Sequence, residues 1–229
     1  MIPSMPSLDN VFWRSLSGPH RHLSAGTATA RRYAAGFSPI VAFADAHHPD
    51  LATLAPFCEP GGRFYCADWD GPAPAGWQVE LEARMVRMAW DGGVPPQDAA
   101  LAAVQLGPRD ADAAVALAAL TRPGPFGPRT LEMGDYFGVF EGGRLIAMAG
   151  ERTCAEGARE VSGVCTHPDF QGRGLARRLM QLLIRRQLAR GELPFLHVMS
   201  ANSGARGLYE RMGFRDDAEC VVRVITRTP

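Results

Sequence analysis

Near the start of the last third of the chain lies the segment Thr166-His167-Pro168-Asp169-Phe170-Gln171-Gly172-Arg173-Gly174-Leu175-Ala176, in which an expected strand runs into a loop with two glycines and then directly into a helix. Glycine allows a tight turn and leaves no Cβ to block a ligand. The first N–H groups of the helix have no partner within the helix, and the helix dipole adds partial positive charge there. Together these features predict a site for a phosphate or pyrophosphate, with Arg173 as an added cation.

Two common phosphate-binding motifs do not match this segment. All 24 basic residues of the chain are arginines, so the lysine of a nucleoside triphosphatase loop is absent. A dinucleotide-binding fold would place GxGxxG after its first strand, whereas the spacing here is GxGxA and occurs late in the chain. The segment therefore matches neither the nucleoside triphosphatase loop nor the dinucleotide-binding motif.

Hydrophobic periodicity around this segment predicts alternating helices and strands. The clearest helix spans 175–190, because its leucines share one side and its arginines the other. The sequence Glu141-Gly142-Gly143 predicts a hairpin turn, and Gly213 ends a short helix. This alternation indicates an α/β or α+β sheet domain. Further helices are expected at 110–120 and 205–212, and strands at 78–90, 99–106, 135–140, 144–151, 160–166, 195–199 and 218–226.

The first ninety residues are less regular than the rest. Proline and glycine recur between Phe57 and Trp77, which indicates turns and loops. Residues 91–97, rich in glycine and proline, form the best linker candidate. We therefore expect an accessory N-terminal domain at 1–90, a linker at 91–97 and a second domain at 98–229.

A second landmark follows downstream, where Asn202 precedes the run ARGLYERMGF at 205–214. With the Gln-Gly-Arg-Gly-Leu-Ala run that starts at Gln171, it makes residues 98–229 resemble the GCN5-related N-acetyltransferases, in particular their FR47-like branch. The resemblance implies an α/β (α+β) fold with a mixed twisted sheet in which two parallel strands splay apart. It also implies that residues 1–90 form a smaller α+β domain, which in this branch can be a degenerate copy of the same fold. We expect that domain to form one wall of the acceptor cleft.

The same resemblance implies acetyl-CoA as the cofactor. The backbone amides of 171–176 would hold its pyrophosphate, the Val164 N–H would face the thioester carbonyl, and Thr166 would pair with the pantetheine arm. Asn202 would contact the cofactor near the second landmark. The cofactor-binding residues implied are Val164, Cys165, Thr166, Gln171, Gly172, Arg173, Gly174, Leu175, Ala176, Asn202 and Ala205.

Tyr209 falls on the family's general acid, which protonates the departing thiolate; alternatively, its ring only packs beside Leu208 and Phe214. Glu160 lies eleven residues before Gln171, the spacing of the base in histone-modifying relatives. In a regular strand Glu160, Ser162 and Val164 would share one face, from which an amine could be approached. Glu160 could equally be an exposed carboxylate at a strand start. Glu151, Glu132 and ordered water are the rival bases.

Other features limit the functions and partners. A formal net charge of zero disfavours broad capture of nucleic acid or anionic membranes. The five cysteines have no CxxC spacing, and the histidines have no ligand partners at metal-binding spacing, so no metal is expected. His197 is interpreted as a packing residue that could also line the cleft. No secretory signal and no long apolar run are evident, so a cytoplasmic protein is expected. We expect it to be a monomer or a homodimer.

These observations predict an acetyl-CoA-dependent N-acetyltransferase that transfers an acetyl group to an unidentified amine by direct attack in a ternary complex. Two alternatives stay open. A non-catalytic acyl-CoA-binding protein would need the same loop, and a longer acyl group would use the same cofactor contacts.

Overall fold

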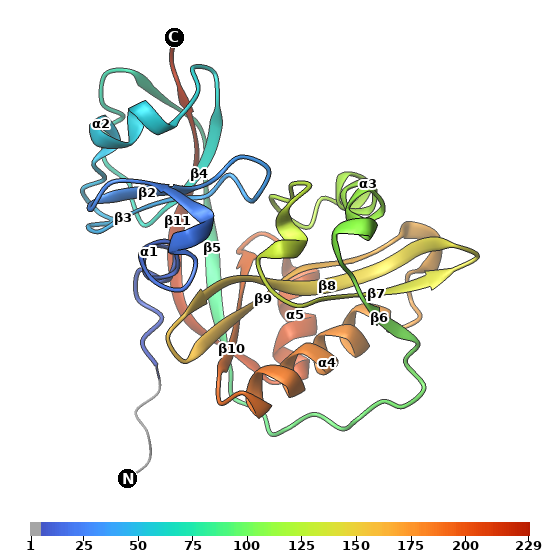
Figure 1. The fold of residues 1–229 in the computed structure, drawn as a ribbon. Helices are drawn as coiled ribbons and strands as arrows, with labels where there is room; N and C mark the ends of the chain where they lie inside the picture. Colours follow the sequence, from blue (N-terminus) through green and yellow to red (C-terminus); the bar gives the residue numbers. More distant parts are fainter. Residues whose placement is uncertain (1–5) are drawn as a thin grey trace.

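The computed structural model describes residues 6–229, which form one eight-stranded mixed sheet and a small three-stranded sheet (Figure 1). The helices are α1 (Val11–Ser17), α2 (Leu51–Leu54), α3 (Ala111–Thr121), α4 (Leu175–Ala189) and α5 (Ser203–Met212). The strands are β1 (Ser24–Gly26), β2 (Ala30–Tyr33), β3 (Val41–Phe43), β4 (Arg63–Ala67), β5 (Trp77–Trp90), β6 (Ala103–Gln105), β7 (Tyr136–Glu141), β8 (Arg144–Ala155), β9 (Ala158–Thr166), β10 (Leu193–Met199) and β11 (Phe214–Arg227). Short 3₁₀ turns lie at Arg21–Leu23, Ala55–Phe57, Pro108–Asp110, Thr130–Glu132 and Pro168–Phe170.

The large sheet has the strand order β4-β11-β5-β10-β9-β8-β7-β6. Its strand pairs are antiparallel except β9 and β10, which run parallel. This parallel pair is hydrogen-bonded only at its start, where Leu193, Pro194 and Phe195 face Ala158, Arg159 and Glu160. Beyond that point β10 pairs only with β5, and β9 only with β8. The two strands therefore splay apart, and the α+β fold with a splayed parallel pair is confirmed.

The helices cover the two faces of the sheet near the splay. Leu179, Leu183 and Ile184 of α4 pack with Val161 of β9 in one buried cluster. On the opposite face, Leu117 of α3 packs with Cys165 of β9 and Met148 of β8. In Figure 1, α4 and α5 accordingly lie on the other side of the sheet from α3. The amphipathic pattern predicted α4 to within one residue, because its buried leucines follow the helical period.

The sheet does not follow the expected division of the chain at residues 91–97. Strands β4 and β5 come from the first ninety residues, yet β5 lies between β10 and β11 in the large sheet. The pairing of β5 with β11 extends from Trp77 to Trp90, so the two strands are bonded along their whole length. The glycines and prolines after Trp90 therefore form a surface loop between two strands of one sheet, not a linker between domains. The composition of this segment indicates a loop, but it does not show which strands pair.

The remaining N-terminal residues form the small sheet, in the order β1-β2-β3, together with α1 and α2. Helix α1 packs on β8, and the hydroxyl of Ser15 accepts a hydrogen bond of 3.2 Å from the Cys154 N–H. The small sheet joins the large one where the Tyr65 N–H donates to the Pro39 carbonyl, at 2.8 Å. The N-terminal segment is thus fixed against the large sheet by hydrogen bonds as well as by apolar packing.

Beneath α1 lies a buried polar cluster of Ser15, His20 and Tyr33. The His20 Nδ1 lies 2.9 Å from the Tyr33 hydroxyl and 3.3 Å from the Ser15 hydroxyl. Burial, together with the positive charge of Arg159, lowers the pKa of His20 from 6.5 to about 4. His20 is therefore neutral in the folded protein at neutral pH.

This lowered pKa predicts acid sensitivity. Since the unfolded chain binds a proton at His20 more readily than the folded one, stability present above pH 6.5 should be lost as the pH falls towards about 4. The shift corresponds to at most about 3 kcal/mol of unfolding free energy. Urea unfolding across this window should show a shallower pH dependence for His20→Gln than for the unsubstituted protein. The exposed His48→Gln is the control, and equal slopes for all three proteins would contradict the prediction.

Candidate active site at the splayed strands

The glycine-rich loop lies at one end of the splay, at the N-terminus of α4. Gly172 and Gly174 have φ angles of 78° and 70°, in the left-handed region that favours glycine. A Cβ added at either position would meet no atom within 4 Å, so the space above the loop is open. Gly174 caps α4, and no side chain bonds to the first N–H groups of that helix. The loop thus has the free backbone donors and the open space that an anion requires.

A groove of about 840 Å³ runs from this loop into the splay. Ten of the residues predicted to bind the cofactor line it: Val164, Cys165, Thr166, Gln171, Gly172, Arg173, Gly174, Leu175, Ala176 and Ala205. Tyr209 lines it too. Arg173 is already engaged, because its Nη1 donates to the Glu141 carboxylate at 2.9 Å and its guanidinium lies over the Phe170 ring.

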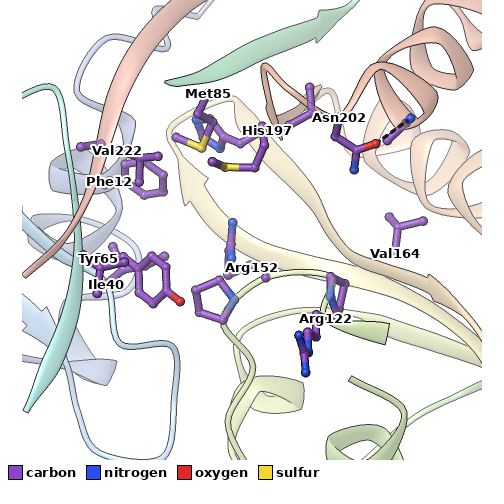
Figure 2. A pocket seen from close by; sticks show the side chains of 18 of the residues that line it. Phe12, Ile40, Tyr65, Met85, Arg122, Arg152, Val164, His197, Asn202 and Val222 are labelled. Atoms are coloured by element: carbon purple, nitrogen blue, oxygen red, sulfur yellow. Dashed lines mark hydrogen bonds between the residues drawn. The ribbon is translucent and has the colours of Figure 1, made fainter. Parts of the chain in front are cut away.

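A second, narrower cavity of about 380 Å³ opens on the other side of the splay (Figure 2). Val164, Ala205, Tyr209 and Thr121 line both the groove and this cavity, so the two spaces meet at these residues. Asn202 lines only the cavity; its Oδ1 accepts a hydrogen bond of 3.1 Å from the Ala205 N–H and caps α5. The first ninety residues contribute Phe12, Ile40, Tyr65 and Met85 to the wall.

An extra residue in β9 places Val164 at this junction. Between Met148 and Gly150 of β8, the partner residues on β9 are Cys165 and Ser162, so β9 has one more residue than β8. Gly163, with φ of 62°, takes up the excess. Val161 and Val164 consequently belong to the same core cluster although they are three residues apart.

The expectation that Glu160, Ser162 and Val164 share one face is therefore wrong, since the bulge reverses the alternation between Ser162 and Val164. The Cys165 thiol is turned away from Val164 and packs in the cluster below α3. Burial raises the pKa of that thiol to about 11, so it is protonated and inert at neutral pH.

Glu160 is the centre of a buried charged cluster. Its carboxylate accepts hydrogen bonds from Nε and Nη2 of Arg152 and from the Thr153 N–H, at 2.8 to 3.2 Å. The His197 Nδ1 lies 2.9 Å from the Glu160 Oε1. Burial alone would raise the pKa of Glu160, but Arg152 and His197 hold it well below its usual range.

This environment does not suit the direct base role expected for Glu160. The side chain is 1% exposed and is not among the residues that line the cavity. Its rivals fit no better: Glu151 accepts from Gln187 and Arg190 in a buried network, and Glu132 pairs with Arg129 at the surface. Neither Glu151 nor Glu132 lines the groove or the cavity.

His197, expected to be a packing residue that could also line the cleft, does line the cavity. An ionised carboxylate can only accept, so the contact with Glu160 requires a proton on Nδ1, and in the tautomer that carries only this proton Nε2 is an acceptor. The ring stacks on Phe12, with a centroid separation of 4.9 Å. No sequence motif links Glu160 to His197, because they come from different strands.

Tyr209 of α5 lies where the groove and the cavity meet. Its ring packs edge-on against Phe214, one of the two residues beside which it was expected to pack. Its hydroxyl forms no hydrogen bond with a protein atom among residues 6–229. Burial raises the pKa of Tyr209, so the phenol keeps its proton at neutral pH.

Among residues 6–229, no three His, Cys, Asp or Glu side chains come together in a way that could hold a metal ion.

Residues 136–223 match the FR47-like protein family. A solved GNAT-family protein from Novosphingobium aromaticivorans is 36% identical, covers 97% of this chain and 99% of its own, and superposes with a TM-score of 0.89. The chain therefore belongs to the GNAT family.

Two other relatives are more distant. A GCN5-related N-acetyltransferase from Kribbella flavida shares the fold, with a TM-score of 0.62 at 18% identity over 94% of this chain and 95% of its own. The N-alpha-acetyltransferase RimI of Mycobacterium tuberculosis is 35% identical over 83 residues. The matched region spans 35% of this chain and about half, 51%, of that curated relative.

Among residues 6–229, no helix has both the length and the apolar character needed to cross a membrane.

The buried cluster predicts a large stability effect. Glu160→Gln removes the charge that compensates Arg152, and breaking a buried ion pair from one side typically costs about 3–5 kcal/mol. Urea unfolding of Glu160→Gln should therefore show a loss of this order. Glu210→Gln removes a partner of Arg206 at the surface and should change the unfolding free energy by less than about 1 kcal/mol. A similarly small loss of unfolding free energy for both variants would contradict the description of Arg152 and Glu160 as a buried ion pair.

Proposed function

We propose that this protein is an acetyl-CoA-dependent N-acetyltransferase that transfers the acetyl group to a primary amine by direct attack in a ternary complex. The observation that carries the proposal is the junction of the groove at the glycine loop with the second cavity at Val164 and Tyr209. Such a junction lets two different molecules meet at one point. The relatives that are acetyltransferases support the same activity.

The groove fits the shape and charge of coenzyme A. The open loop at Gly172 and Gly174 would receive the pyrophosphate, and the free N–H groups at the start of α4 would donate to it. Beyond the last β9–β10 pair, the edge of β9 that faces the splay has no strand partner and would bond the pantetheine arm through Val164 and Thr166. The splay is thus a site that an extended ligand can complete.

Acetyl-CoA would supply an acetyl thioester at the junction. The Val164 N–H would donate to the carbonyl oxygen, where negative charge would grow as the amine attacks. In the transfer, a bond from the amine nitrogen to the carbonyl carbon would replace the bond from that carbon to sulfur. Tyr209 would give its phenolic proton to the departing sulfur, since burial raises the pKa of the phenol and keeps it protonated at neutral pH.

For the amine proton, the structure favours His197 over Glu160 as the acceptor. The Nε2 of His197 has no hydrogen-bond partner among residues 6–229, and the ring lines the cavity in which an amine would sit. Glu160 acts through His197, because its carboxylate holds the ring in the tautomer that can accept a proton. Glu160 is accordingly a positioning residue.

The cofactor assignment can be tested with one substitution in the loop. Gly174→Glu places a carboxylate where the pyrophosphate would lie, and about 1.4 kcal/mol of repulsion suffices to weaken binding tenfold. Calorimetric titration with acetyl-CoA and with free CoA should show at least this loss. Gly191→Glu, beyond the other end of α4, is the matched control, because Gly191 has a similar φ of 73° and equally open space. Equal affinity in both variants would refute the assignment.

The role of Tyr209 is tested by Tyr209→Phe, which keeps the ring and removes the proton donor. Turnover with a responsive amine should fall at least about tenfold, within the range for loss of a general acid, while acetyl-CoA affinity stays the same. Steady-state kinetics and calorimetry measure the two quantities. Unchanged turnover would remove Tyr209 from the mechanism, and acetyl-CoA binding without turnover of any amine would favour the non-catalytic alternative.

A further inference from the structure

We propose that the acceptor is a free apolar α-amino acid, whose carboxylate pairs with Arg152 and Arg122 in the second cavity. This inference rests on the function proposed above. It names the acceptor class from the charge, the size and the apolar wall of that cavity.

The charged groups that line the cavity carry positive charge only. Arg122 and Arg152 line it, and Asp and Glu do not. A polyamine or a lysine-rich segment would bring additional ammonium groups that find no carboxylate there. A carboxylate next to the reacting amine would instead be attracted.

Arg152 has one edge of its guanidinium free for such a carboxylate. Its Nε and Nη2 are bonded to Glu160, whereas its Nη1 contacts no acceptor among residues 6–229. The side chain lines the cavity and is only 10% exposed, so it is largely shielded from open solvent. Guanidinium groups bind carboxylates best when buried and held in a fixed orientation, and Glu160 provides that orientation.

Gly124 keeps the space in front of that nitrogen open. A Cβ at Gly124 would lie 3.7 Å from the Arg152 Nη1 and would meet no other atom within 4 Å. Gly124 belongs to the loop Pro123-Gly124-Pro125, which follows α3 and lines the cavity. In Figure 2 the Arg152 side chain projects between the two walls of the cavity.

Arg122 supplies the charge that Arg152 lacks after pairing with Glu160. It caps α3 in the left-handed conformation, with φ of 51°, and its exposed side chain has no carboxylate partner in the described part of the chain. Because the Arg152–Glu160 pair is neutral as a whole, Arg122 makes the cavity cationic. In Figure 2 Arg122 lies below Arg152, away from Met85 and Asn202 at the opposite end of the view.

The facing wall is apolar and suits a hydrophobic side chain. Phe12, Ile40, Tyr65 and Val222 lie together on the other side of the cavity in Figure 2, and Met85 lies above them. A volume of about 380 Å³ is at the small end for ligand pockets and fits a single amino acid. The cavity thus presents cations to one end of the acceptor and hydrocarbon to the other.

The test compares L-leucine, L-methionine and L-phenylalanine with their amides as acceptors, with CoA release as the readout. The amides keep the amine and the side chain but lack the carboxylate. We expect kcat/KM for at least one amino acid to exceed that of its amide by about tenfold or more, as for a lost charged hydrogen bond. Equal or better use of the amides would overturn the inference while leaving N-acetyl transfer intact.

Arg122→Ala and Arg122→Glu provide the second arm. Because Arg122 is exposed, both variants should fold, raise KM for the amino acid about fivefold or more and leave KM for acetyl-CoA unchanged. Arg109→Ala, at an exposed arginine before α3 that lines neither space, is the matched control and should behave like the unsubstituted protein. An unchanged KM in both Arg122 variants would overturn the inference. Acetyl-CoA binding without acetylation of any amine would overturn the proposed function and this inference with it.

Discussion

The short pairing of β9 with β10 is the constraint on which the site depends. Three register pairs join the strands, and the extra residue at Gly163 then turns the β9 backbone as the strands diverge. Sheets normally satisfy their backbone groups through neighbouring strands, so a break inside a sheet leaves donors and acceptors that need another partner. Here the groove lies on one side of the break and the second cavity on the other, and Val164 and Tyr209 line both.

The buried cluster of Arg152, Glu160 and His197 lies beside this break. Glu160 is the last β9 residue paired with β10, and its carboxylate bonds to Arg152 on β8 and His197 on β10. A buried ion pair is costly to form and to break, so its geometry is fixed. It holds the His197 ring of β10 and the Arg152 guanidinium of β8 at the cavity, where β9, the strand between them, stops pairing with β10. The N-terminal helix adds Phe12 against the same ring and so ties the accessory segment to the site.

The sequence predicted the parts of the site that are local in the chain. The glycine loop was predicted from eleven consecutive residues, and α4 from the helical period of its leucines and arginines. Tyr209 was singled out by a motif that lies within one short helix. The Gly163 bulge could not be predicted, because strict alternation assumes that neighbouring strands have equal numbers of residues. The His197–Glu160 contact joins residues 37 positions apart on strands whose pairing is not visible in either segment. The placement of β5 inside the large sheet was hidden for the same reason.

A crystal structure of the protein with bound CoA would show whether the splay between β9 and β10 holds the cofactor. We expect the pyrophosphate on the backbone amides of 171–176, the pantetheine arm bonded to the β9 edge at Thr166, and the sulfur between Val164 and the Tyr209 hydroxyl. A structure in which β9 and β10 pair along their full length, or in which CoA binds away from the splay, would contradict this expectation.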